Sequence, residues 1–182
     1  MTLSASRRIE WIRDAIDAHQ GRLIRFAMRF TGNLETARDV VQDTFLKLCR
    51  EDPDRVDHLP AWLFRVCRNR ALDIKRKEGP LQRLDDATSD ALPDPREALD
   101  EGLGRDEDQR RVLAELRELP ATTREVLRLR FQEELSYKEI SSVTGHSVSH
   151  VGVLIHHGIR QLRERLRVGA PARDGSSDRR TS

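Results

Sequence analysis

The residues best suited to chemistry in this sequence are an amide side chain, Asn69, and the basic residues around it. The segment 65–77 holds six lysines or arginines and a single acid, Asp73. Arginine and lysine hold phosphates, and asparagine can read the edge of a base. A run of positive charge can also be an ordinary solvated surface. The segment is therefore a candidate nucleic-acid surface, and its use depends on the elements that position it.

A helix over 61–77 would divide this segment into two faces, because successive helical residues are about 100° apart. The apolar face holds Leu63, Val66, Cys67, Ala71 and Ile74. The opposite face holds the candidate nucleic-acid-binding side chains, which are Arg65, Arg68, Asn69 and Arg76. The helix thus has a core side and a basic side with an amide in its middle.

The preceding helix, predicted over 34–50, carries a second candidate face. Its core stripe consists of Ala37, Val40, Val41, Thr44 and Leu48. A separate row with i, i+3, i+4, i+7 spacing consists of Asp39, Gln42, Asp43 and Leu46. This row is acidic and has one apolar member. It fits a protein-docking face, and it equally fits a helix surface with one partly exposed leucine.

Two helices near the end of the sequence are joined by a short turn that contains Gly145. Ser136 and Glu139 have the spacing of a capping box, which predicts the start of the first helix. The pair forms the helix-turn-helix pattern, whose second helix enters the major groove. The candidate DNA-binding residues there are Ser147, Ser149, His150, Val153, His156, His157 and Arg160. The adjacent histidines point about 100° apart on a helix, so we predict no metal pair.

The helical patterns together with the composition predict a small all-α protein with a segregated charge. The chain has 182 residues, of which 37% are hydrophobic and 35% charged, with a net charge of +2. The segment 78–108 holds eleven acids and three arginines, and 79–104 includes three prolines. We therefore predict two small helical domains, 1–78 and 105–168, joined by a flexible acidic linker over 79–104. The tail 169–182 is predicted to be disordered.

The remaining composition favours a cytoplasmic protein without catalysis. Cys49 and Cys67 are too few for a disulfide framework and lack metal-site spacing, so we expect two buried thiols in a reducing compartment. No apolar run approaches the roughly 18 residues of a membrane span, and the N-terminus has no signal core. We also find no Gly-rich phosphate loop, metal-ligand cluster or nucleophile–base set. No enzyme activity, cofactor, metal or membrane insertion is predicted.

Taken together and in order, these motifs resemble the extracytoplasmic-function (ECF) sigma factors of the sigma-70 family. The resemblance lies in ETARDVVQDTFLKL at 35–48, AWLFRVCRNRALD at 61–73, Leu119-Pro120 with REVLRLRF at 124–131, and LSYKEIS at 135–141. It implies two helical domains on a flexible tether. The first would bind RNA polymerase and melt the −10 promoter element, and the second would bind the −35 element as duplex.

The resemblance also implies roles for the candidate residues. Asp39, Gln42, Asp43 and Leu46 fall on the helix that docks on the clamp helices of the largest polymerase subunit, and the second domain would meet the flap region. Arg65, Arg68, Asn69 and Arg76 fall where the family contacts the −10 strand, and the loop 52–60 falls where it captures an extruded base. Trp62 falls in a motif that suggests core packing rather than base stacking. An anti-sigma factor is a further expected partner.

Two other functions are compatible with parts of the sequence. An autonomous helix-turn-helix regulator would not need the row at 39–46 or the basic helix. A sigma mimic that only sequesters an anti-sigma factor would not need Asn69. The last helix departs from many relatives at Gly152, Leu154 and Ile159, so the −35 residues are the least conventional part of the resemblance. Glycines there would allow close approach to DNA or to a packed helix.

Overall fold

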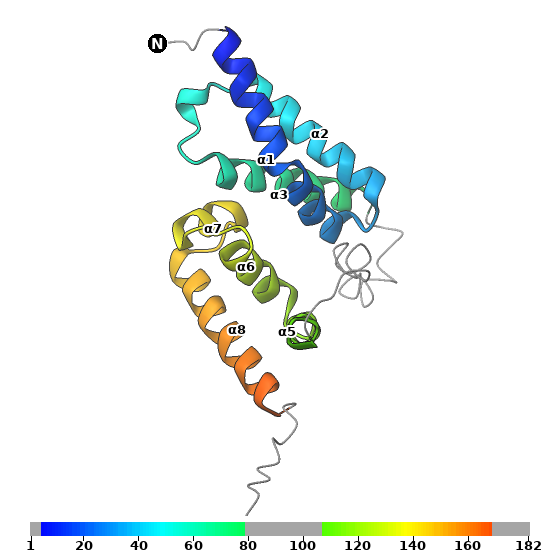
Figure 1. The fold of residues 1–182 in the computed structure, drawn as a ribbon, viewed down its shortest axis with the longest axis vertical. Coiled ribbons are helices and arrows are strands. Elements are labelled where there is room, and N and C mark those ends of the chain that lie inside the picture. Colours follow the sequence, from blue (N-terminus) through cyan, green and yellow to red (C-terminus); the bar gives the residue numbers. More distant parts are fainter. Residues whose placement is uncertain (1–4, 79–106, 169–182) are drawn as a thin grey trace, which may run out of the picture.

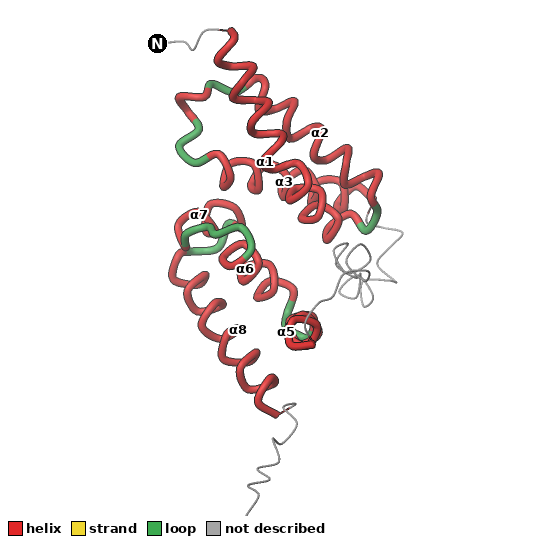
Figure 2. The backbone as a smooth tube through the Cα atoms, in the orientation of Figure 1, coloured by secondary structure: helices red, strands yellow, loops and turns green. Residues whose placement is uncertain are grey.

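The computed structural model describes residues 5–78 and 107–168, and all regular secondary structure in these ranges is helical. The elements are α1 (Ala5–Thr31), α2 (Leu34–Arg50), the 3-10 turn η1 (Pro53–Arg55), α3 (Leu59–Glu78), α5 (Glu107–Arg117), α6 (Ala121–Phe131), α7 (Tyr137–Thr144) and α8 (Val148–Val168). Figure 2 shows this helical content along the chain. The all-α prediction is confirmed. The predicted linker 79–104 and tail 169–182 lie outside the described residues.

Helices α1, α2 and α3 pack on one another and form the N-terminal helical group. Its core includes the fully buried Leu23, Phe26 and Phe64, and the last two rings meet edge to face with centroids 5.0 Å apart. Burial of each such side chain contributes about 1.5–3 kcal/mol. Trp62 is only 7% exposed, which confirms the prediction that it packs in the core.

Local sequence sets the path from α1 to α2. Gly32 ends α1 with a positive φ of 73°, which glycine adopts without steric cost. The Asn33 side chain then accepts a hydrogen bond of 2.8 Å from the backbone N–H of Thr36. This N-cap satisfies one of the free donors of the helix start. It fixes where α2 begins and therefore which of its residues face outward.

Helices α5 to α8 form the C-terminal helical group, in which α8 packs on α5, α6 and α7. The predicted capping box is present: the Ser136 N–H donates to the Glu139 carboxylate at 2.7 Å, and the Glu139 N–H donates to the Ser136 hydroxyl at 3.3 Å. Gly145 follows α7 with a φ of 80°. The left-handed residue turns the chain into α8 and completes the predicted helix-turn-helix.

The N-terminal part of α3 lies between the two helical groups, where it contacts α1 and α2 on one side and α7 on the other (Figure 1). Four consecutive residues, 61–64, are buried. Because consecutive residues are about 100° apart, four of them cover nearly the whole circumference of a helix. A helix lying on one core would bury only a stripe. This part of α3 is therefore covered from both sides.

Candidate nucleic-acid interface

The basic face of α3 is partly covered by the C-terminal helical group. The guanidinium of Arg68 donates to both carboxylate oxygens of Glu125 on α6, at 2.7 and 3.3 Å. The two side chains are only 16% and 14% exposed. Arg65 is exposed, and it donates to the hydroxyl of Ser142 on α7 at 3.3 Å. Half of the predicted −10 residues thus contact another part of the same chain.

The other two predicted −10 residues remain open. Asn69 is exposed beside Arg68, and Arg76 is exposed about two turns further along α3, where it pairs with Asp73. Arg70 points to α2 instead and pairs with Asp43 at 2.7 Å. The face therefore keeps its amide accessible while its central arginine is occupied. An exposed amide flanked by guanidiniums can bind a nucleic-acid strand through base edge and phosphate.

The row predicted for protein docking lies on the outer side of α2. Asp39 and Gln42 are exposed, and Leu46 has 49% of its surface exposed. Asp43 is half-buried because of its ion pair with Arg70. The core stripe predicted on this helix is buried, and it also includes Phe45, which is 8% exposed. The four residues form one acidic surface with an apolar side chain in it, which is suited to a basic or mixed partner.

The residues predicted for the major groove are all exposed. They are Ser147, Ser149, His150, Val153, His156, His157 and Arg160. The start of α8 is fixed locally: the Ser147 hydroxyl accepts from the His150 N–H at 3.2 Å, and the Ser141 hydroxyl donates to the carbonyl of His146 at 2.6 Å. Near its other end, Arg165 pairs with Glu115 of α5 at 3.5 Å. Helix α8 is thus held at both ends, and the predicted DNA-binding residues remain exposed between them.

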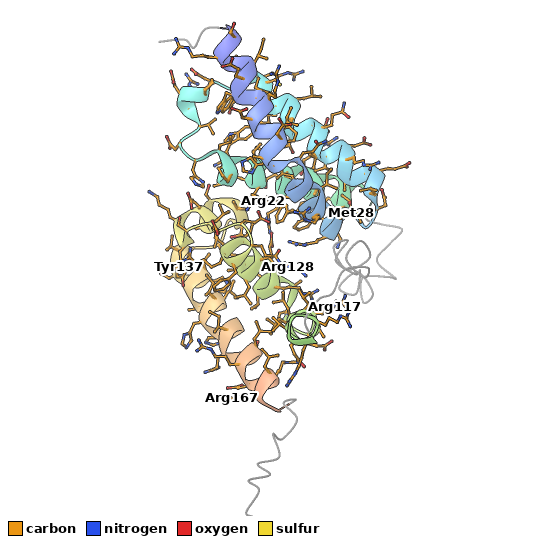
Figure 3. The ribbon with its side chains drawn as sticks, viewed as in Figure 1. Arg22, Met28, Arg117, Arg128, Tyr137 and Arg167 are labelled. Atoms are coloured by element: carbon orange, nitrogen blue, oxygen red, sulfur yellow. The ribbon has the colours of Figure 1, made fainter. Side chains whose placement is uncertain are left out.

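Two more ion pairs join the helical groups, and sequence reasoning did not identify them. Arg22 of α1 pairs with Glu133 at 2.7 Å, and Figure 3 shows Arg22 between the two groups. His58, which precedes α3, lies with Nδ1 2.9 Å from the Glu139 carboxylate. The same nitrogen is 3.3 Å from the Ala61 N–H. Without a proton, Nδ1 can accept the Ala61 N–H and cap the start of α3. With a proton, it donates to the Glu139 carboxylate instead.

Ionisation of two groups at this boundary is shifted from ordinary values. Burial opposes ionisation of Glu139, but hydrogen bonds from the Ser136 backbone and hydroxyl and the charge of His58 outweigh it, so its pKa is lowered. Burial, together with the positive charges of Arg22 and His58, lowers the pKa of His19. Burial and nearby positive charge thus favour the neutral ring of His19, whereas hydrogen bonds from Ser136 and the charge of His58 favour the carboxylate of Glu139.

The two cysteines differ, which corrects one prediction. Cys67 is fully buried on α3, and burial raises its pKa to about 12. Cys49 is exposed near the end of α2, so the prediction that it is a buried thiol was wrong. It directly follows the buried Leu48, and the helical step of about 100° between them turns the Cys49 side chain away from the core stripe. Proximity to an apolar stripe in the sequence does not give the direction of a helical side chain.

Among the described residues, no helix is both long enough and apolar enough to span a membrane. The same parts of the chain contain no group of three or more His, Cys, Asp or Glu side chains arranged to hold a metal ion.

A helix-turn-helix with an open recognition helix, joined to a second helical group with a basic face, defines a DNA-binding transcription protein. Family models match in the same order: "Sigma-70 region 2" over residues 15–80 and "Sigma-70, region 4" over residues 109–162. The chain belongs to the sigma-70 family, in its ECF group of RNA polymerase sigma factors.

Individual relatives agree with this assignment. The chain is 31% identical over 161 residues to "ECF RNA polymerase sigma factor SigE" of Mycolicibacterium smegmatis, an alignment that covers 84% of this chain and 60% of that protein. It is 26% identical to "RNA polymerase sigma factor YlaC" of Bacillus subtilis, covering 85% of this chain and 91% of that protein. The chain thus spans less than two thirds of the first of these relatives and most of the second.

A solved structure has the same fold. It is the sigma factor RpoE in complex with the anti-sigma factor NepR from Bartonella quintana, with a TM-score of 0.60 and 21% sequence identity. The match covers 87% of this chain and 98% of that one. At this identity, the likeness supports the arrangement of helices.

Proposed function

We propose that this chain is an ECF-type sigma factor that directs core RNA polymerase to specific promoters and initiates transcription. It acts by recognition and DNA opening, without catalysis of its own, in the compartment that holds the polymerase and the chromosome, the cytoplasm. The observation that carries the proposal is the order of the two sigma-70 models on the two helical groups. Residues 1–78 would dock on polymerase and open the −10 element, and 105–168 would bind the −35 element.

Polymerase docking is assigned to the row Asp39, Gln42, Asp43 and Leu46 on α2. Its exposure supports this role, since a docking surface must be available in the free protein. The exposed Leu46 supplies the apolar contact that an acidic surface otherwise lacks. The partner surface would be the clamp helices of the largest polymerase subunit. The flap region of the polymerase would be met by the C-terminal helical group.

Recognition of the −10 element is assigned to Arg65, Arg68, Asn69 and Arg76 on α3. A single strand is held by positive charge along its backbone and by contacts to unstacked bases. Asn69 is the one neutral side chain in this set, and its amide has both a donor and an acceptor for a base edge. The arginines would position the strand.

Recognition of the −35 element is assigned to the open face of α8. Val153 can contact a thymine methyl, while Ser149 and the histidines can donate to bases or phosphates. An anti-sigma factor is a proposed regulatory partner, because the fold matches that of a sigma factor solved with one bound. Such a partner would control access to the DNA-binding faces.

The decisive experiment is run-off transcription of genomic fragments by core RNA polymerase, with and without the purified protein. New start sites that depend on the protein are the expected result, and they would give the promoter sequences. Binding to duplex DNA without polymerase, and no new transcripts, would instead favour an autonomous helix-turn-helix regulator. Neither activity, together with tight binding to an anti-sigma factor, would favour a sigma mimic.

A further inference from the structure

In the polar contacts described between the two helical groups, the basic or donating side chain comes from the N-terminal group. Three such contacts place the basic partner in the N-terminal group: Arg22 with Glu133, Arg68 with Glu125, and His58 with Glu139. The neutral contacts follow the same rule. Arginines of α1 and α3 donate to the Gln132 carbonyl, the Gln132 side chain and the Ser142 hydroxyl. The C-terminal group therefore presents a row of carboxylates and acceptors to a row of donors.

The three carboxylates, Glu125 on α6, Glu133 after α6 and Glu139 on α7, form an acidic row, and Glu125 lies against part of the predicted −10 face. Glu125 occupies the Nε–Nη2 edge of the Arg68 guanidinium, an edge that a phosphate could use in the same bidentate way. Ser142 occupies one donor of Arg65. A DNA strand would thus compete with Glu125 for Arg68 and with Ser142 for Arg65.

The boundary between the two helical groups is polar in part. A groove of about 370 Å³ at this boundary is lined by charged and amide side chains, which are Arg22, Arg25, Arg29, Gln132, Glu133 and Glu134. Residues 61–64 of α3, which contacts α7, add buried apolar side chains to the boundary. Polar contacts between domains of one chain permit relative motion more readily than a large apolar interface does. The central pair Arg68–Glu125 is nevertheless well shielded from water, so its loss should be costly to the closed arrangement.

We infer that the acidic row of Glu125, Glu133 and Glu139 holds the free chain closed, and that within it Glu125 occupies the −10 face and masks the central arginine, Arg68, from DNA. The identification of that face as a −10 site rests on the function proposed above. The closed arrangement itself rests on the contacts alone. Opening of the two groups must accompany promoter melting, and an unpaired single strand supplies the phosphates that replace the carboxylates.

The test measures closure and DNA binding in the full-length chain. The exposed Cys49 on α2 and an introduced Gln161→Cys on α8 accept a donor and an acceptor dye, while the buried Cys67 does not react. Wild type should give one high-transfer population at low salt. Glu125→Arg should shift the open-to-closed ratio about tenfold or more, since an unpaired buried guanidinium then faces a like charge.

The charge swap keeps this test falsifiable if a single variant folds poorly. Arg68→Glu combined with Glu125→Arg should restore the high-transfer population, because the pair is re-formed with its polarity reversed. Glu118→Arg, which makes the same charge change at an exposed position, should leave transfer unchanged. Equal transfer in wild type and Glu125→Arg, or no recovery in the swap, would overturn the inference.

DNA access is read with fluorescein-labelled, mixed-sequence single-stranded DNA. Glu125→Arg should bind it about tenfold more tightly than Glu118→Arg, which carries the same net charge. Equal affinities would mean that the contact does not mask the DNA face, and this result would also overturn the inference. Closure with no run-off transcripts from either open or closed variants would contradict the proposed function and leave the closed arrangement standing.

Discussion

Two neighbouring helices carry the predicted polymerase and −10 faces, and the chain presents them in different ways. On α2, the side chains of Asp39, Gln42 and Leu46 are exposed on the outer surface. On α3, Arg68 is enclosed by the C-terminal helical group. The difference arises from position. Helix α3 is the part of the N-terminal group that contacts α7 of the C-terminal group, whereas α2 packs on α1 and α3.

This difference gives an order to the proposed events. A protein with an open docking face and a covered DNA face can meet polymerase before it can hold a single strand. Binding energy from the first contact is then available to separate the helical groups. Free sigma factor would bind little DNA by itself, and specificity for promoters would come from the assembled enzyme.

The largest expected difference between the two helices is in thiol chemistry. Cys49 on α2 is exposed, whereas Cys67 on α3 is fully buried with a pKa raised to about 12. We expect Cys49 to react with a maleimide at least ~1,000-fold faster, because Cys67 reacts only after opening of its core. Mass spectrometry after timed labelling measures both rates. Comparable rates under native conditions would mean that the N-terminal core is not formed as described.

The second expected difference separates polymerase affinity from promoter opening. Leu46→Asp should weaken binding to core polymerase about tenfold or more, because a central apolar contact is replaced by charge. Asn69→Ala should leave that affinity unchanged and reduce promoter opening about tenfold, since base contacts of this kind contribute about 1–3 kcal/mol. Core-enzyme pull-down and permanganate footprinting measure the two effects. Equal loss of polymerase binding in both variants would contradict the division between α2 and α3.

The features that sequence predicted correctly depend on neighbouring residues. The Asn33 cap, the Ser136–Glu139 capping box and the turn at Gly145 are each determined within a few residues. Helical periodicity likewise predicted the outward row on α2 and the buried core stripe. These signals suffice for an all-α fold with a helix-turn-helix, since each depends only on local geometry.

The features that sequence missed depend on partners far away in the chain. Arg22 and Glu133 are separated by 111 positions, and Arg68 and Glu125 by 57. Neither pattern nor composition identifies which acid an arginine will meet across such distances. Glu125 also lies within the family-like segment 124–131, where the sequence alone shows it only as a polar residue of a helix. The covering of α3 therefore became visible only with the two groups in place.

Helix α8 also has a covered face and an open face, and substitutions that distinguish them should have smaller effects. A Cβ at Gly158 would lie 2.7 Å from Thr123 Cγ2 and 2.8 Å from Leu127 Cδ1, whereas at Gly152 the nearest atom is in the Tyr137 ring at 3.7 Å. Gly158 therefore serves helix packing. We expect Gly158→Ala to destabilise the fold by about 1–2 kcal/mol, since overpacking outweighs the gain in helix propensity.

The matched variant Gly152→Ala should stabilise the protein by about 0.5–1 kcal/mol, because its methyl group makes an ordinary contact and the helix gains propensity. Urea unfolding followed by circular dichroism measures both free energies of unfolding. Stabilisation by both substitutions would show that α8 does not pack closely on α6.

The smallest expected effect tests the contact between Glu139 and His58. Hydrogen bonds from Ser136 and the charge of His58 overcome the opposing effect of burial and lower the pKa of Glu139. A lowered pKa in the folded state means that the carboxylate contributes stability above its ordinary pKa, and that this contribution disappears as pH falls through the folded value. Glu139→Gln keeps the capping box but removes the charge. It should lower the free energy of unfolding by about 0.5–1 kcal/mol at neutral pH.

The difference between wild type and Glu139→Gln should shrink toward zero in acid, and Glu118→Gln, at an exposed position, should show no such dependence. In the two-dye assay, Glu139→Gln should also shift the chain slightly toward the open population, by less than Glu125→Arg, since its partner His58 is half-exposed. A difference in stability that stays constant from neutral to acidic pH would assign the role of Glu139 to the capping box alone. In that case the closed arrangement would depend on the two arginine pairs, and the α2–α3 contrast would stand without a contribution from His58.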